Sequence, residues 1–439
     1  MASNMILRIE SLGHRGVGIG RHQGKVVMVP LSAPGDLLEL RLTDSHSTYD
    51  EAEIVRILEA SPHRRTPPCP YFGRCGGCQL QHLDPQCQRF QKQRILRQML
   101  GSQSQVEENK VLDLLWGTEE FGYRCRVDLH VSWEGAAKLG FARSRSSSLI
   151  FIRRCMVAME KLNGFLPAVR ELLGSAGATS VKRLEIACGT VGEDFTLFMT
   201  GAMPVPKRSL QRLAELCGRI PGLRALWYGR APGGQARRIW RSPGPWEGVL
   251  MELELPNLEG QLLEAWPGVF TQVNPQVNRL LVQTLLSWVR ELRPRRVLDL
   301  YAGVGNLSIP LATVAKEVVA VEVDPRAVHN GIANCNRLGI SNIRWVRQSA
   351  ANALSGMSAH GDEFDLVVMD PPRSGAKELL GPLAALRPQA IIYISCDPAT
   401  LARDLGRFQR DLGYTVERVQ PLDMFPQTFH IESLSLILK

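Results

Sequence analysis

The sequence predicts an α/β protein built of three successive parts. Residues 1–62 contain short apolar runs separated by Gly-rich and Pro-Gly turns, a pattern typical of a small closed β-barrel of the oligonucleotide-binding type. Residues 63–260 mix strand-like runs with a basic helix, which predicts a central α+β domain. Residues 261–439 alternate strands with helices, which predicts a Rossmann-like domain whose ligands lie at the carboxyl ends of parallel strands.

The chain is basic and its arginines are clustered. It carries 52 Lys and Arg against 43 Asp and Glu, a formal net charge of +9, with pairs such as Arg153–Arg154 and Arg237–Arg238. This excess favours a nucleic-acid partner, because phosphates attract cations and the released counterions drive binding. Solvated basic faces would give the same pattern, so charge alone leaves nucleic-acid binding open.

The composition argues against a membrane or secreted protein. No apolar run reaches the ~20 residues that cross a bilayer, and the first residues lack the apolar core and cleavage site of a secretory signal. We therefore expect a cytoplasmic protein with no membrane partner, whose ten cysteines are mostly reduced.

A basic amphipathic helix is predicted at residues 86–100, "QCQRFQKQRILRQML". Its cations would either contact RNA or simply face water. The wider helical segment, at about residues 86–118, is expected to pack on the C-terminal domain.

The turn after the first strand of the predicted parallel sheet indicates a cofactor site. In "DLYAGVGN", residues 299–306, the glycines let the backbone approach a ligand closely. The turn lacks the third glycine of the dinucleotide fingerprint and the Lys-Ser/Thr of a phosphate loop. A turn that cradles no phosphate suits S-adenosylmethionine, and another nucleotide ligand is the alternative. Glu322 ends the second strand, where a carboxylate can accept from ribose hydroxyls, and Asp370 ends a later strand at the same crevice.

Three cysteines within ten residues predict a metal site. "CPYFGRCGGC" places Cys69, Cys75 and Cys78 with five and two residues between them. The candidates for a distant fourth ligand are Cys87, Cys125 and Cys155. Zinc binds such short pairs, and an iron–sulfur cluster binds four thiolates, so the spacing alone leaves the metal open.

A further cysteine stands at the end of a predicted parallel strand. In "YISCDPATLARD", residues 393–404, Cys396 precedes an Asp-Pro turn that would direct its side chain into the crevice. "DMFPQTFHIE", residues 423–432, adds His430 and Glu432 near the C-terminus. A lone cysteine is usually inert filler, but a thiol with a base beside it suits nucleophilic catalysis.

The order of these motifs resembles that of a known family. The motifs "FTQVNP", "DLYAGVGN", "VEVDP", "DPPR", "SCDPATLARD" and "DMFPQTFHIE" occur in the order seen in RNA uracil-5-methyltransferases. The resemblance covers nearly the whole chain. The front half is similar to the branch with an N-terminal TRAM barrel and an iron–sulfur cluster. The resemblance therefore implies a TRAM barrel, a central iron–sulfur domain with a [4Fe-4S] cluster, and a class I methyltransferase domain that uses S-adenosylmethionine.

The resemblance also implies site residues. The implied cofactor ligands are Gln272, Tyr301, Asn306, Glu322, Ser349 and Asp370. At the position of Ser349 the family often has an Asn or an acidic residue instead. The implied fourth cluster ligand is Cys155, because "GFARSRSSSLIFIRRC" matches the strand that precedes that ligand in the family.

The chemistry of this family assigns Cys396 as the nucleophile and Glu432 as the base. C5 of uracil becomes carbanion-like only when a thiolate has added at C6. A base must then remove the C5 proton so that the thiol can leave, and His430 is the second candidate for it. We expect no redox step, so the cluster would fold the central domain and shape its RNA surface.

The expected partner is RNA and not DNA. An unpaired uridine is favoured, since a base that is already unstacked costs least to flip. Cluster-bearing relatives act mostly on large-subunit ribosomal RNA, so 23S rRNA is favoured over the T-loop of transfer RNA. The alternative from another functional class is a non-catalytic RNA-binding assembly factor.

Overall fold

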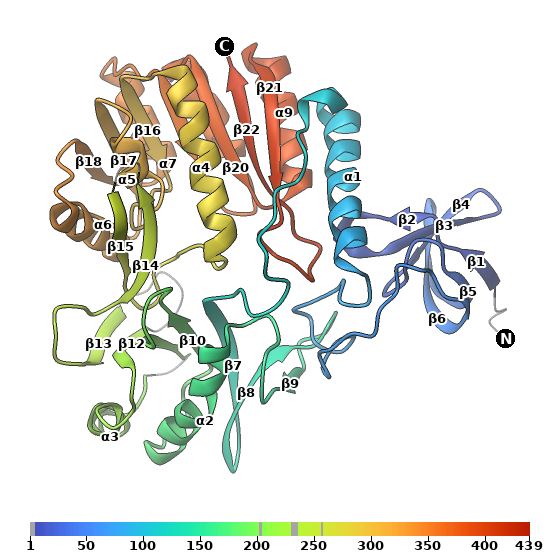
Figure 1. The fold of residues 1–439 in the computed structure, drawn as a ribbon, viewed down its shortest axis with the longest axis horizontal. Helices are drawn as coiled ribbons and strands as arrows, with labels where there is room; N and C mark the ends of the chain where they lie inside the picture. The colour runs from blue at the N-terminus through green and yellow to red at the C-terminus, as the bar shows by residue number, and fades with distance from the viewer. Residues whose placement is uncertain (1–4, 202–203, 230–235, 256–257) are drawn as a thin grey trace.

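The computed structural model describes residues 5–201, 204–229, 236–255 and 258–439 and shows three parts (Figure 1). The first part is a six-stranded sheet in the order β1-β5-β6-β4-β3-β2. Its strands are β1 (Met5–Arg8), β2 (Ser11–Leu12), β3 (Gly18–His22), β4 (Lys25–Val29), β5 (Leu37–Ser45) and β6 (Tyr49–Glu59). This is the small barrel that the turn pattern predicts.

The barrel closes where β1 lies against β3. A side chain at Gly20 would bring its Cβ to 2.8 Å from the carbonyl oxygen of Arg8, so only glycine allows this approach. Alternate residues of the strands point inward, among them Val27, Leu38 and Leu40, which are fully buried. A core of period-two apolar residues therefore holds the barrel together.

The central part is an α+β domain with a seven-stranded mixed sheet in the order β13-β12-β11-β10-β7-β8-β9. Its strands are β7 (Arg126–Glu134), β8 (Ala136–Ala142), β9 (Leu149–Phe151), β10 (Arg183–Cys188), β11 (Phe195–Thr200), β12 (Leu223–Gly229) and β13 (Ala236–Arg241). Its helices are α2 (Glu160–Ser175) and α3 (Lys207–Cys217). Leu162, Leu166 and Val169 of α2 share one buried core with Leu184 and Ile186 of the sheet. The hairpin of β14 (Val249–Leu255) and β15 (Leu258–Ala265) then leads to the last part.

The last part has a seven-stranded sheet in the order β18-β17-β16-β19-β20-β22-β21. Its strands are β16 (Arg296–Leu300), β17 (Glu317–Glu322), β18 (Ile343–Arg347), β19 (Leu366–Met369), β20 (Ala390–Ser395), β21 (Thr415–Leu422) and β22 (Glu432–Leu438). Its helices are α4 (Pro275–Leu292), α5 (Ser308–Ala312), α6 (Pro325–Leu338), α7 (Ala350–Ala359), α8 (Leu380–Leu386) and α9 (Pro398–Leu412). All strands are parallel except β22, which runs antiparallel between β20 and β21. The Rossmann-like α/β prediction is confirmed, with this strand as an addition.

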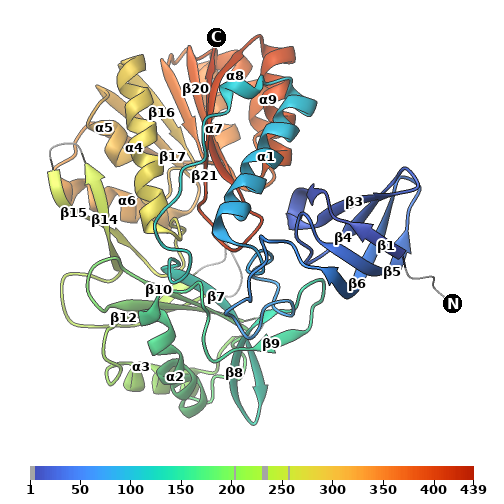
Figure 2. The ribbon, with the colours of Figure 1, turned by 45° about the vertical axis from the view of Figure 1, so that its right-hand side comes forward.

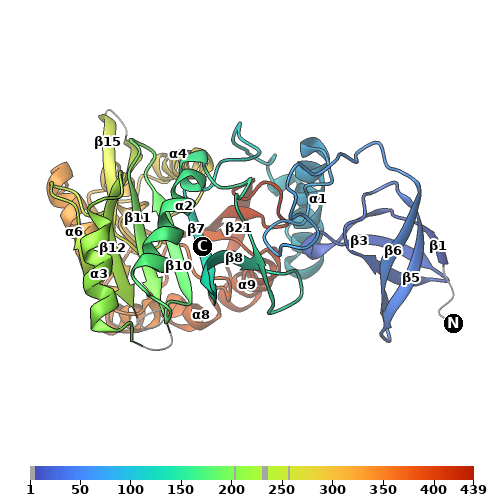
Figure 3. The ribbon, with the colours of Figure 1, turned by 90° about the horizontal axis from the view of Figure 1, so that it is seen from below.

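Helix α1 (Pro85–Ser104) comes early in the chain but lies between the barrel and the last part (Figures 2 and 3). Asp84 starts it as an N-cap, because its carboxylate accepts from the backbone N–H of Cys87 at 2.7 Å. Leu96 and Leu100 are buried in one core with Leu405 of α9. The other side of α1 binds the barrel. The Gln91 amide oxygen accepts from the backbone N–H of Leu12 at 3.2 Å.

The interpretation of the α1 cations is wrong for Lys92, which neither faces water nor is placed to contact RNA. Its side chain is 1% exposed, and its Nζ donates to Asp423 Oδ1 at 2.7 Å and to the Phe425 carbonyl at 3.0 Å. Periodicity could not reveal this, because α1 is covered on two sides by segments distant in sequence. Among the described helices, none is long and apolar enough to cross a membrane.

Candidate active site

The pairing of β20 with β22 places the predicted thiol beside the predicted base. The two strands are antiparallel, with Ser395 opposite Ser433. One step further along this register, Cys396 and Glu432 meet at the carboxyl edge of the sheet. The Asp397 carboxylate then caps α9 by accepting from the N–H groups of Ala399 and Thr400 at 3.0 and 2.9 Å. Cys396 is therefore held between a strand and a helix and is half-buried, as the Asp-Pro turn predicts.

The electrostatics of Cys396 show which groups share its site. Burial, followed by the charges of Glu432 and Asp370, raises the pKa of the thiol to about 12. Arg373 acts in the opposite direction, because its positive charge favours the thiolate and its guanidinium can donate to it. At neutral pH the free protein thus holds a protonated thiol, and a nearby positive charge would promote its ionisation.

Glu432 has the properties of a general base. Its side chain is buried, and burial followed by the charge of Asp370 raises the pKa of its carboxyl well above the ordinary value. A carboxylate with a raised pKa is a stronger base once ionised. Burial likewise raises the pKa of Asp370 to about 7, although the Gln272 amide donates to its Oδ2 at 3.1 Å.

His430 lies on the same loop as Glu432 but is less suited to proton abstraction. Its Nε2 lies 3.2 Å from Arg373 Nη2, so the neutral ring accepts from the guanidinium. Burial and the charge of Arg373 lower its pKa to about 3. A base role for His430 therefore has little support, and an orienting role fits its contacts better.

The glycine turn at residues 299–306 has the backbone expected of a ligand-binding turn. Tyr301, Gly303 and Gly305 all have positive φ, of 66°, 56° and 96°. The Glu322 carboxylate is fixed beside this turn, because its Oε2 accepts from the Gly303 N–H at 3.0 Å. The side chain of Glu322 thus lies where the second strand meets the turn, as predicted.

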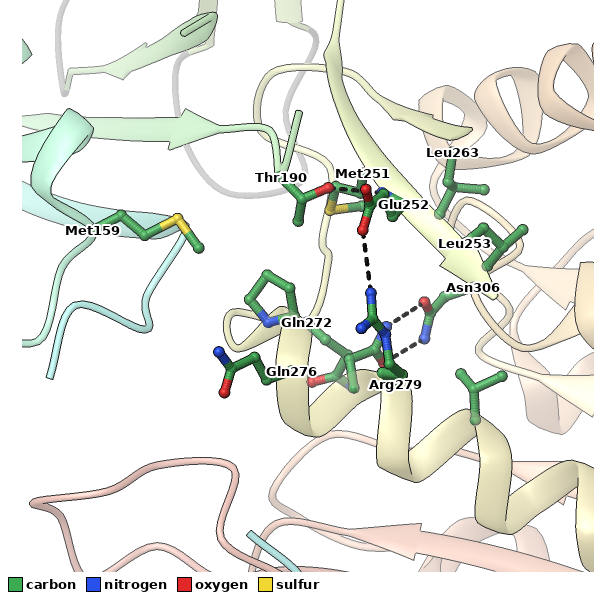
Figure 4. Close-up of a pocket in the computed structure, with 13 residues that line it drawn as sticks. Met159, Thr190, Met251, Glu252, Leu253, Leu263, Gln272, Gln276, Arg279 and Asn306 are labelled. Atoms are coloured by element: carbon green, nitrogen blue, oxygen red, sulfur yellow. Dashed lines mark hydrogen bonds and ion pairs between the residues drawn. The ribbon is translucent and has the colours of Figure 1, made fainter. Parts of the chain in front are cut away.

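Two other predicted cofactor ligands, Gln272 and Asn306, line one cavity of about 300 Å³ (Figure 4). Its walls come from β14, from the start of α4 and from the turn before β11. Asn306 exchanges two hydrogen bonds with Asn278 of α4, at 2.9 and 3.0 Å. The cavity therefore lies between the central domain and the C-terminal sheet, on the side that carries the glycine turn.

Ser349 is exposed, and its hydroxyl caps α7 by accepting from the Asn352 N–H at 3.3 Å. It follows β18, and its observed role is in starting the helix. A cofactor contact by Ser349 stays a prediction.

Four of the ten cysteines lie within electrostatic range of one another. Burial raises the pKa of Cys78 to about 12, and Cys155, Cys75 and Cys69 add to this rise. The two other candidate ligands, Cys87 and Cys125, are not among the groups that perturb Cys78. Within the described part of the chain, however, no three His, Cys, Asp or Glu side chains are arranged to hold a single metal ion.

Comparison with known proteins decides the family. A model of tRNA (uracil-5-)-methyltransferases matches residues 260–439, and a TRAM-domain model matches residues 5–55. A Pseudomonas putida protein named 23S rRNA (uracil(1939)-C(5))-methyltransferase RlmD is 34% identical over 439 residues, 98% of this chain and 92% of that protein. A protein of the same name from Alkalilimnicola ehrlichii is 35% identical over 98% of this chain and 95% of its own. The chain belongs to the RNA uracil-5-methyltransferase family.

A solved structure has the same fold as this methyltransferase. The Pyrococcus abyssi tRNA (uracil-54, C5)-methyltransferase, in complex with S-adenosyl-L-homocysteine, superposes with a TM-score of 0.74 over 99% of both chains at 22% identity. The predicted resemblance and the N-terminal TRAM domain are thus confirmed. The protein is an enzyme of RNA methylation whose methyl donor is S-adenosylmethionine.

Sequence reasoning missed one member of this methyltransferase's site. Arg373 Nη2 lies 3.2 Å from His430 Nε2, and the charge of Arg373 lowers the pKa of both Cys396 and Glu432. The only signal was its place directly after the "DPP" turn, which brings a cation to the same strand end as Asp370.

Proposed function

We propose that the enzyme forms 5-methyluridine at one unpaired uridine of 23S ribosomal RNA through a covalent bond between Cys396 and C6 of the base. The observation that carries this proposal is the β20–β22 register, which brings the thiol and Glu432 together beside Asp370. The ribosomal substrate is supported by the relatives whose names specify 23S rRNA.

Each residue then has a defined task. S-adenosylmethionine, when bound, supplies an electrophilic methyl group, and Gln272, Asn306 and Glu322 would hold it. This assignment is supported by the cavity that Gln272 and Asn306 share and by the bond of Glu322 to the glycine turn. The Cys396 thiolate adds to C6 and turns C5 into a nucleophile. After C5 has gained the methyl group, the Glu432 carboxylate removes the C5 proton, the C5–C6 double bond re-forms and the thiolate leaves.

The target must be unstacked, because the thiol approaches one face of the ring. Flipping costs a few kcal/mol and is cheapest for a base that is not paired. A uridine in the transfer-RNA T-loop meets the same requirement, so it is the second candidate substrate. DNA and membranes have no part in the proposal, and a cytoplasmic location stays a prediction.

The substrate is tested by mass mapping of 5-methyluridine in RNA from cells with and without this gene. The expected result is the loss of one 5-methyluridine from 23S rRNA and its return when the gene is restored. Loss from transfer RNA alone would overturn the ribosomal assignment. Loss from neither would favour the RNA-binding assembly factor.

We also propose that Cys69, Cys75, Cys78 and Cys155 bind a [4Fe-4S] cluster. Their thiols lie within electrostatic range of one another, and the set is wholly sulfur, which suits iron–sulfur chemistry. A cubane cluster binds each cysteine at a separate iron, so its ligands stand further apart than those of one ion. The Cys155 segment is fixed, since its N–H donates to Asn163 Oδ1 at 2.8 Å.

The cluster proposal predicts the behaviour of Cys75→Ser. We expect this variant, purified without oxygen, to lose visible absorbance, bound iron and most of its soluble yield, because serine is a poor ligand for iron–sulfur clusters. Cys87→Ser is the matched control, since Cys87 is buried outside the group and should keep iron and colour. Wild-type protein with stoichiometric zinc and no iron would contradict the assignment.

A further inference from the structure

The segment that precedes Glu432 is bound mainly by residues that lie outside the C-terminal sheet. We call residues 423–431 the base loop, since it joins β21 to Glu432, the first residue of β22. The Met424 carbonyl accepts from Asn274 Nδ2 at 3.2 Å, and the Phe425 carbonyl accepts from Lys92 Nζ at 3.0 Å. The Pro426 carbonyl accepts from the Tyr123 hydroxyl at 3.0 Å. The Gln427 carbonyl accepts from the backbone N–H groups of Gln79 and Leu80, at 3.0 Å each. Four consecutive carbonyls are thus fixed by four separate segments.

Gln427 is the residue of the base loop with the most polar contacts to distant segments. Its Oε1 accepts from Arg65 Nη2 and Gln88 Nε2, both at 3.0 Å. Its Nε2 donates to the Glu120 carbonyl at 3.3 Å, and its own N–H donates to Gln88 Oε1 at 3.0 Å. Both functional atoms of the amide and both backbone polar groups therefore have partners within the protein.

The conformation of Gln427 indicates that these contacts determine its position. Its φ is 69°, in the left-handed region that non-glycine residues adopt at a cost. Its side chain is buried, with 1% exposed, and sits on a loop rather than in a regular element. Such a conformation persists only where the surroundings over-determine it.

We propose that Gln427 is a positioning residue for the general base Glu432. The inference rests on the proposed function, because it assumes that Glu432 removes the C5 proton. Gln427 itself touches neither the thiol nor a substrate, since its polar atoms are all used within the protein. It acts by fixing the base loop against Gln88 and Arg65, so that the Glu432 carboxylate reaches the C5 proton at hydrogen-bond distance.

If Gln427 positions Glu432, its substitution should slow product release much more than it slows formation of the covalent complex. Cys396 lies at the end of β20, outside the base loop, so thiol addition and methyl transfer depend on Gln427 only weakly, through the charge of Glu432. Product release does depend on Gln427, because a displacement of the Glu432 carboxylate by about 1 Å lowers the rate on the order of 10²-fold. A residue with a purely structural role would instead lower both steps together through the fraction of folded enzyme.

The test uses Gln427→Met and Gln88→Met, which keep side-chain length and remove the amide contacts. Single-turnover reactions with the RNA substrate are quenched in denaturant, and the covalent RNA–protein complex is followed by gel. We expect both variants to form the methylated complex at a rate within about threefold of wild type. We expect its breakdown to be about 10-fold to 100-fold slower. Gln88 lies on α1, so its variant tests the contact without changing the base loop.

Gln420→Met is the matched control. Gln420 is also buried, at 7% exposure, and its amide donates to the carbonyls of Asp113 and Pro421 at 2.6 and 3.1 Å, but it lies in β21 before the base loop. The covalent complex of Gln420→Met should break down at the wild-type rate. Equal breakdown rates in Gln427→Met and wild type, or equal slowing in the control, overturn the inference. If Glu432→Gln itself releases product normally, the base assignment fails instead, and the two failures are distinguishable.

Discussion

Cys396→Ala is expected to abolish methylation, with a fall of about 10⁴-fold or more, as for the loss of other enzymatic nucleophiles. It should also abolish the denaturation-resistant complex that wild-type enzyme forms with RNA containing 5-fluorouridine. Fluorine at C5 cannot leave as a proton does, so the thioether between Cys396 and C6 is trapped. The measurement is a denaturing gel after incubation with S-adenosylmethionine.

The control for this prediction is Cys335→Ala. Cys335 is buried in α6 of the same domain and is not part of the site, so its variant should keep both the complex and methylation. If Cys396→Ala forms the same complex as wild type, another group is the nucleophile. If wild type forms none, the enzyme does not use covalent catalysis.

Glu432→Gln is expected to accumulate the methylated covalent complex, because the C5 proton has no base. Breakdown should slow by about 10²-fold to 10⁴-fold. The rate at which the covalent complex forms should instead rise at neutral pH. The charge of Glu432 raises the pKa of the Cys396 thiol, so its removal lowers that pKa and increases the thiolate fraction at a given pH.

The pH profile separates these two effects. Because the Cys396 pKa is raised to about 12, complex formation by wild type should rise with pH throughout the neutral range. In Glu432→Gln the same rise should occur at lower pH. A variant that turns over at the wild-type rate would move the base elsewhere, with His430 as the next residue to test.

Much of the site can be predicted from the sequence, because apolar runs show where the buried strands end. Cys396 and Asp370 each come directly after a fully buried apolar strand, and parallel strands deliver such residues to one edge. The position of Glu432 is harder to predict, because it depends on β22 entering the sheet antiparallel beside β20. The family resemblance supplied that residue, and periodicity did not.

The contacts that support the site were not predictable from local pattern. Lys92 and Asp423 are 331 residues apart, and Gln88 and Gln427 are 339 apart. Nothing in a basic helix distinguishes a buried lysine from a solvated one until its partner is known. The hydroxyl of Ser349 caps α7, a contact that its motif position did not indicate, and its predicted cofactor contact stays a prediction.

The antiparallel insertion of β22 has a consequence for how the enzyme matures. The last strand fills the gap between β20 and β21, and it brings Glu432 with it. On the proposed mechanism, the sheet therefore cannot be completed without Glu432, the group proposed to release the product. A molecule that lacked β22 would also lack that carboxylate.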